Sequence, residues 1–110
     1  MPHPRILIIE DHPLMAEAIA VSVQSCLPQA HFCFANSLAT ALTQLASPEP
    51  WVLVLVDLNL PDSLGLDTFN AVCQLRSQGA ILVLSESQDN AIEQACLANS
   101  VLFFNKALPS

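Results

Sequence analysis

Short apolar runs that alternate regularly with segments of helical periodicity place the strongest constraint on the fold of this chain. Five runs are almost entirely apolar, at residues 6–9, 31–35, 52–56, 81–84 and 101–104. Continuous runs of this length are typical of strands that are covered on both faces. We therefore predict five strands, with a helix between each consecutive pair.

The four segments between these strands carry apolar residues at helical spacing, which indicates amphipathic helices. The predicted inward-facing residues are, in chain order, Leu14, Ala18 and Val21; Leu38, Ala41, Leu42 and Leu45; Phe69, Val72, Cys73 and Arg76; and Ile92, Ala95 and Cys96.

The ends of the predicted helices carry residues that commonly start or stop a helix. Pro13 suits the first position of the first helix, which ends before Pro28. Ser37 and Asp89 can cap the second and fourth helices through their side-chain oxygens. Asn99 is predicted to take the left-handed conformation that ends the fourth helix.

Strict alternation of strands and helices predicts right-handed β-α-β units and an α/β fold, a doubly wound five-stranded parallel sheet with helices on both faces. The 110 residues are expected to form one domain spanning residues 1–110. No helical pattern follows the fifth strand, because only residues 107–110 come after Lys106. One face of the sheet is therefore expected to be short of a helix.

The charge balance excludes some classes of partner. The chain has a formal net charge of −7 and only three Lys or Arg residues, which argues against direct binding to nucleic acid phosphates. Its apolar runs are far shorter than the roughly 18 to 20 residues of a membrane span, so no membrane contact is expected. The N-terminal segment does not resemble a secretory signal, so a cytoplasmic location is the expectation.

Polar side chains gather at the strand ends. The first strand is followed by Glu10 and Asp11, and the third by Asp57. Because the carboxyl ends of parallel strands meet at one edge of the sheet, these carboxylates are expected to lie together. They would repel one another without a cation, and oxygen ligands with waters are what Mg²⁺ prefers. We therefore predict a magnesium site.

The fourth and fifth strands end in a hydroxyl, Ser85, and in the only lysine, Lys106. A metal ion, a hydroxyl and an ammonium around Asp57 would neutralise a phosphoryl group attached to that carboxylate. Each residue alone has an ordinary alternative, as a helix cap, a turn residue or a surface lysine. The four strand ends together favour the site. His12, beside the acid pair, is interpreted as an exposed residue at a helix start.

Four segments of the sequence carry a resemblance to a known family. They are residues 8–14, 56–66, 82–85 and 103–106, and the most specific is residues 56–66, with the sequence VDLNLPDSLGL. The chain resembles a response regulator receiver domain, with a flavodoxin-like topology, and is most similar to the subgroup whose full-length members carry a C-terminal helix-turn-helix of the LuxR/NarL type. Relative to that family, its final helix is missing.

The resemblance implies a role in two-component signal transduction and a function for each of seven residues. By position, Asp57 accepts a phosphoryl group; Glu10, Asp11, Asp57 and the backbone carbonyl of Asn59 bind Mg²⁺; Ser85 and Lys106 contact the phosphoryl oxygens; and Phe103 turns inward as Ser85 moves.

The implied donor is a sensor histidine kinase or a phosphotransfer protein. The domain would catalyse only its own phosphorylation and dephosphorylation, could form a homodimer, and would reach DNA for transcription regulation only through an output domain outside this chain. Glu86, which follows Ser85 where the family usually has a small residue, is expected to slow phosphotransfer or to alter hydrolysis.

Two other functions remain open. A degenerate receiver would act as an interaction module without phosphorylation. A phosphohydrolase of the haloacid dehalogenase type also uses an Asp nucleophile, Mg²⁺, a Ser or Thr and a Lys, but it needs a second acid two residues later, where this chain has Asn59.

Overall fold

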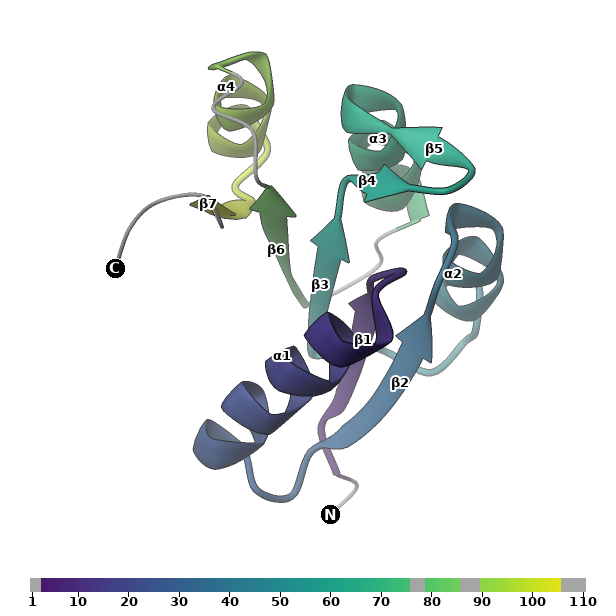
Figure 1. The fold of residues 1–110 in the computed structure, drawn as a ribbon, viewed down its shortest axis with the longest axis vertical. Helices are drawn as coiled ribbons and strands as arrows, with labels where there is room; N and C mark the ends of the chain where they lie inside the picture. The colour runs from purple at the N-terminus through teal and green to yellow at the C-terminus, as the bar shows by residue number, and fades with distance from the viewer. Residues whose placement is uncertain (1–2, 76–78, 86–89, 106–110) are drawn as a thin grey trace.

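The structure, a computed structural model, describes residues 3–75, 79–85 and 90–105. Its main sheet has five parallel strands in the order β2-β1-β3-β6-β7 (Figure 1). These strands are β1 (Arg5–Ile9), β2 (His31–Ala35), β3 (Leu53–Asp57), β6 (Ala80–Ser85) and β7 (Leu102–Asn105). The predicted doubly wound sheet is confirmed, and each strand end lies within one residue of its predicted position.

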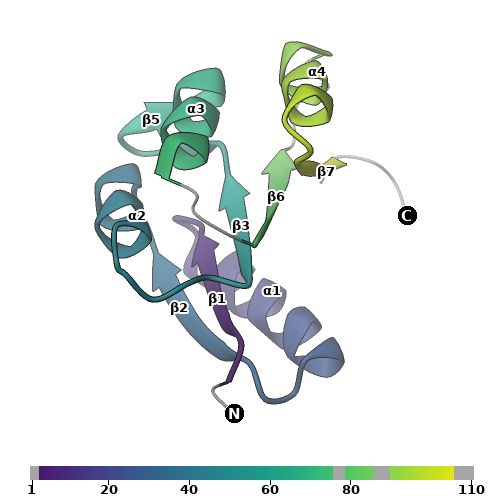
Figure 2. The ribbon, with the colours of Figure 1, turned by 180° about the vertical axis from the view of Figure 1, so that it is seen from behind.

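Within the described residues, four helices cover the two faces of this sheet: α1 (Pro13–Cys26), α2 (Leu38–Leu45), α3 (Gly65–Leu75) and α4 (Asn90–Ala98). Helices α2, α3 and α4 pack on one face and contribute to the larger buried core. Helix α1 lies on the opposite face (Figures 1 and 2) and packs on a second, smaller core. Within the described part of the chain, no helix is both long and apolar enough to cross a membrane.

The predicted inward face of α1 is wrong. Leu14 and Val21 are 82% and 63% exposed. The residues that pack on the sheet are instead Ala16, Ile19, Ala20 and Val23. The helix is apolar on most of its circumference, so its sequence does not mark which side meets the sheet.

The helix ends agree with the sequence at one predicted position and differ at another. The Ser37 hydroxyl accepts a hydrogen bond from the Thr40 N–H, as expected of an N-cap. The left-handed residue after α4 is Ser100 (φ 56°) rather than Asn99. The Asn99 N–H still donates to the Ala95 carbonyl, which extends the helical bonding and moves the left-handed turn one residue on. Asp89 and Arg76 lie outside the described residues.

A short hairpin follows β3 and was not predicted. Strand β4 (Asn59–Leu60) pairs antiparallel with β5 (Ser63–Leu64). Hydrogen bonds fix the start of the hairpin against α3, because the Leu58 carbonyl accepts bonds from the Gly65 N–H and from the buried hydroxyl of Thr68. Strands of two residues are too short to show a period in the sequence.

Two further hydrogen bonds join the hairpin to α2. The carboxylate of Asp62 accepts hydrogen bonds from the N–H groups of Leu38 (2.7 Å) and Ala39 (3.0 Å) at the start of that helix. These N–H groups have no partner inside the helix, and the positive end of the helix dipole favours a carboxylate there. Both bonds hold the pKa of Asp62 below its ordinary value.

The described residues cover only part of the sheet face that carries α1. An apolar groove of about 330 Å³ runs beside α1, over Leu55, Leu82, Leu84 and Phe104. In residues 3–75, 79–85 and 90–105, no other helix packs on this face. This arrangement is consistent with the predicted lack of a final helix.

Candidate metal and phosphoryl site

The candidate site lies at the carboxyl edge of the main sheet. Asp57 is the last residue of β3 and is 5% exposed. Its neighbour in the sheet register is Leu84, so Ser85, the last residue of β6 and 3% exposed, lies one position further along the same edge. Open α/β sheets bind their ligands at this edge.

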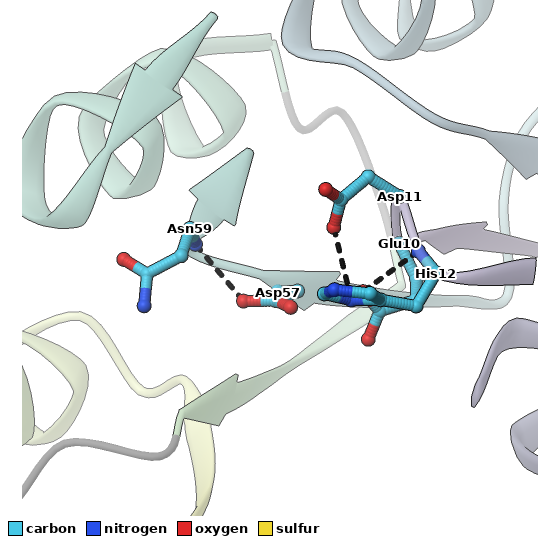
Figure 3. A network of polar contacts seen from close by, with 5 residues as sticks. All are labelled: Glu10, Asp11, His12, Asp57 and Asn59. Carbon is cyan, nitrogen blue, oxygen red and sulfur yellow. Dashed lines mark hydrogen bonds and ion pairs between the residues drawn. The ribbon is translucent and has the colours of Figure 1, made fainter. Parts of the chain in front are cut away.

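Three carboxylates meet at this edge (Figure 3). Glu10, Asp11 and Asp57, together with His12, each place one potential metal-binding atom within 4.8 Å of all the others. The Glu10 side chain is fully buried, and the Asp11 side chain is 28% exposed. The structure thus brings together the three acids that were expected to meet. A cavity of about 440 Å³, bounded by α1, β2 and α2, opens beside Glu10 and Asp11.

The backbone that follows Asp57 orients its carboxylate. The Asn59 N–H donates to Asp57 Oδ1 at 2.9 Å (Figure 3). Asn59 begins strand β4, so the hairpin holds this N–H in place. The predicted use of the Asn59 carbonyl as a metal ligand stays a prediction.

The oxygen atoms of the cluster fit a divalent cation. The Oδ1 atom of Asp11 is buried and, among the described residues, has no hydrogen-bond partner. A buried acceptor without a hydrogen bond is unfavourable unless a positive charge, such as a metal ion or a protonated imidazole, lies beside it. Carboxylate oxygens that converge in this way match the ligand preference of Mg²⁺.

His12 takes part in the cluster, and the sequence interpretation missed this. Its side chain is 71% exposed at the N-cap of α1, as expected of a helix-start residue. Its ring nevertheless turns back, with Nδ1 3.0 Å from Glu10 Oε2 and 3.2 Å from Asp11 Oδ1. The hydrogen bond with Glu10, and then the charge of Asp11, raise the pKa of His12 above its ordinary value. The sequence signal was its position directly after the acid pair.

The remaining predicted residues lie on β7 and beyond. Phe103 is half-buried and packs against the larger core. Asn105 is the register neighbour of Ser85. Lys106 and Glu86 lie outside the described residues.

Comparisons with known proteins agree with this fold. A family model for the response regulator receiver domain matches residues 6–109. The glycerol metabolism activator of Pseudomonas putida is 29% identical over 109 residues, which cover 96% of this chain and 48% of that protein. The chain therefore spans about half the length of this curated relative.

Two solved structures have similar folds. One is a response regulator from Burkholderia pseudomallei with a phosphorylated aspartic acid, a calcium ion and citrate; it has 21% identity and a TM-score of 0.78, and the match covers 96% of this chain and 61% of that one. The other is the response regulator TrrA from Thermotoga maritima in complex with Mg²⁺-BeF, with 19% identity, a TM-score of 0.75 and coverage of 94% and 86%.

Proposed function

The chain belongs to the response regulator receiver domain family, whose members are signalling domains rather than ordinary enzymes, and on this premise we propose that Asp57 accepts a phosphoryl group in a Mg²⁺-dependent step. The donor is a phosphohistidine of a sensor kinase or a phosphotransfer protein. The observation that carries the proposal is the position of Asp57, buried at the sheet edge beside two other carboxylates. The phosphorylated aspartic acid and calcium ion of the Burkholderia protein support it.

The carboxylates of Glu10, Asp11 and Asp57 would hold the metal ion, together with the backbone carbonyl of Asn59. When bound, Mg²⁺ supplies positive charge that neutralises the oxygens of the transferring phosphoryl group. The buried Oδ1 of Asp11, which accepts no hydrogen bond among the described residues, supports this assignment, because an ion would satisfy it.

The protein contributes the nucleophile and its orientation. A carboxylate oxygen of Asp57 attacks phosphorus, so that an O–P bond forms while the N–P bond of the phosphohistidine breaks and the imidazole leaves with the electron pair. The Asn59 N–H keeps the Asp57 carboxylate in one orientation throughout. Ser85 donates its hydroxyl to one phosphoryl oxygen, and Lys106 pairs with another.

The signal is a shift in population between two states of the domain. Ser85 moves toward the phosphoryl group, and Phe103, half-buried on β7, turns inward as it does so. Ser85→Ala should therefore give a folded domain that is still phosphorylated but whose surface at β7 changes little on phosphorylation.

The output lies outside this chain. We assign the chain to the LuxR/NarL-type subgroup, in which an output domain contacts DNA in the cytoplasm. The Pseudomonas relative supports an output part, since it is named an activator and about half of it lies beyond the matched region. The partly covered sheet face beside α1 supports pairing with a second copy as a further contact.

Intact mass spectrometry tests the phosphorylation. The chain is incubated with Mg²⁺ and acetyl phosphate, as wild type, as Asp57→Ala, and as Asp67→Ala, a matched control that removes an exposed carboxylate from the first turn of α3. The wild type and Asp67→Ala should gain one phosphoryl group that hydroxylamine removes, and Asp57→Ala should gain none. If no variant forms an adduct under any condition, the chain is instead a degenerate receiver that acts through protein contacts alone.

A further inference from the structure

His12 is the one side chain of the acidic cluster that the proposed phosphotransfer leaves without a role. It occupies the N-cap of α1, where a side chain usually accepts a hydrogen bond from the helix, yet its side chain makes no such bond. The imidazole is turned instead toward the two carboxylates that precede it (Figure 3).

The spacing of its Nδ1 atom matches that of a metal ligand. Two ligands at right angles around an ion, each bound at about 2.1 Å, lie about 3.0 Å apart. His12 Nδ1 is 3.0 Å from Glu10 Oε2 and 3.2 Å from Asp11 Oδ1. A carboxylate oxygen of Asp57 is the fourth potential ligand atom and lies within 4.8 Å of each of the others.

A single hydrogen bond accounts for only one of these contacts, and the contact with Asp11 is an ion pair when the imidazole is protonated. The ring nitrogen can share one proton with Glu10, and this leaves the buried Asp11 Oδ1 without a hydrogen bond. An ion bound by all three atoms satisfies Glu10, Asp11 and His12 together. The exposed side of the ring would then cover the ion from solvent, while the fully buried Glu10 lies behind it.

We propose that His12 Nδ1 is a protein ligand of the divalent ion, which raises the affinity of this site for first-row transition-metal ions more than its affinity for Mg²⁺. This proposal rests on the proposed function, because it assumes that the acidic cluster is the metal site. Mg²⁺ takes oxygen ligands and keeps its waters, whereas imidazole suits the transition metals, which any nitrogen-containing site binds more tightly along the series from Mn²⁺ to Cu²⁺.

Metal titration of the purified chain tests this, with Co²⁺ and Mg²⁺ as the ions at one fixed, mildly alkaline pH. The variants are His12→Ala and the control His31→Ala, which removes an exposed histidine from the start of β2. His12→Ala should weaken Co²⁺ binding at least about tenfold. Even mutation of a residue that only hydrogen-bonds to a metal ligand typically lowers metal affinity about 10- to 100-fold. Mg²⁺ binding should change by less than about threefold, because water can replace the lost ligand.

The visible absorption of bound Co²⁺ gives a second measurement, independent of phosphorylation. Its ligand-field bands should shift in His12→Ala and stay unchanged in His31→Ala. Equal Co²⁺ affinity in wild type and His12→Ala, unchanged bands, or equal losses for both ions would overturn the proposal.

The outcome also separates this inference from the proposed function. If the wild type takes up phosphate with Mg²⁺ but His12→Ala binds Co²⁺ normally, only the role of His12 is wrong. If the wild type binds neither ion, both the inference and the Mg²⁺-dependent step fail.

Discussion

Two glycines with left-handed backbones provide a matched test of how this sheet is built. Gly65 (φ +59°) has open space where a Cβ would be, whereas at Gly79 (φ +91°) a Cβ would lie 2.1 Å from the Trp51 carbonyl oxygen and 2.8 Å from that of Val52. These are backbone atoms, so no side-chain rotation can relieve the contact. Gly79→Ala should therefore cost far more stability than Gly65→Ala.

The magnitudes follow from what must move. For Gly65→Ala, placing an alanine in the left-handed conformation costs about 1–2 kcal/mol. Alanine also lowers the entropy of the unfolded chain, which offsets about 0.4–1 kcal/mol of this cost. The net loss in the free energy of unfolding is therefore about 1 kcal/mol. At Gly79 the same strain is joined by an overpacking cost of about 1–3 kcal/mol. Val52 cannot yield freely, because its N–H donates to Arg5 and its carbonyl accepts from Ala80. We expect a loss of about 2–4 kcal/mol for Gly79→Ala.

Urea unfolding followed by circular dichroism measures both losses, and unchanged m-values would show that the midpoints report stability alone. A loss for Gly79→Ala within about 0.5 kcal/mol of that for Gly65→Ala would refute the reasoning. It would mean that the start of β3 shifts easily, in spite of its bonds to β1 and β6.

Three further predictions concern the metal, pH and association. Mg²⁺ at ten times its Kd should stabilise the wild type by about 1.4 kcal/mol, which raises Tm by on the order of 5 °C. In a thermal melt, Asp57→Asn should lose most of this rise in Tm. An equal rise in both proteins would mean that the ion binds elsewhere. The pKa of Asp62 is lowered in the folded protein. Its carboxylate therefore stabilises the fold fully at a pH above its pKa in the unfolded chain, and this stabilisation is lost as the pH falls through its pKa in the folded protein. The stability gap between wild type and Asp62→Asn should close over that range in acid urea titrations, and a gap constant with pH would contradict this. The apolar groove beside α1 should make the purified chain self-associate in sedimentation, and a stable monomer would contradict this.

The elements with strong local signals could be predicted from the sequence. Continuous runs such as residues 6–9 are buried on both faces of the sheet, so their pattern does not depend on any partner. The stripe of α2 was also predicted, because Ala41 and Leu45 are buried while polar residues occupy the far side of the helix. The meeting of Glu10, Asp11 and Asp57 followed from topology alone, since parallel strands end at one edge.

The missed features depend on tertiary structure. Nothing in the composition of α1 distinguishes Ala16, which is buried, from Leu14, which is not; the smaller side chain lets the helix approach the sheet. Thr68 and Asp62 fix the β4–β5 hairpin to its surroundings through bonds to residues 10 and 24 positions away in the chain, which no local pattern shows. The rotamer of His12 depends on where two carboxylates end up in space.

The bonds around the Leu58 carbonyl have a consequence for the carboxylate of Asp57. The peptide group between Leu58 and Asn59 is planar, so fixing its carbonyl also fixes its N–H. Thr68 and Gly65 donate to that carbonyl, and the N–H donates to Asp57. The hydroxyl, the peptide and the carboxylate therefore form a chain of two hydrogen bonds, an arrangement in which each bond strengthens the next. Thr68 of helix α3 thereby helps to hold the N–H that orients the Asp57 carboxylate, through a single peptide group.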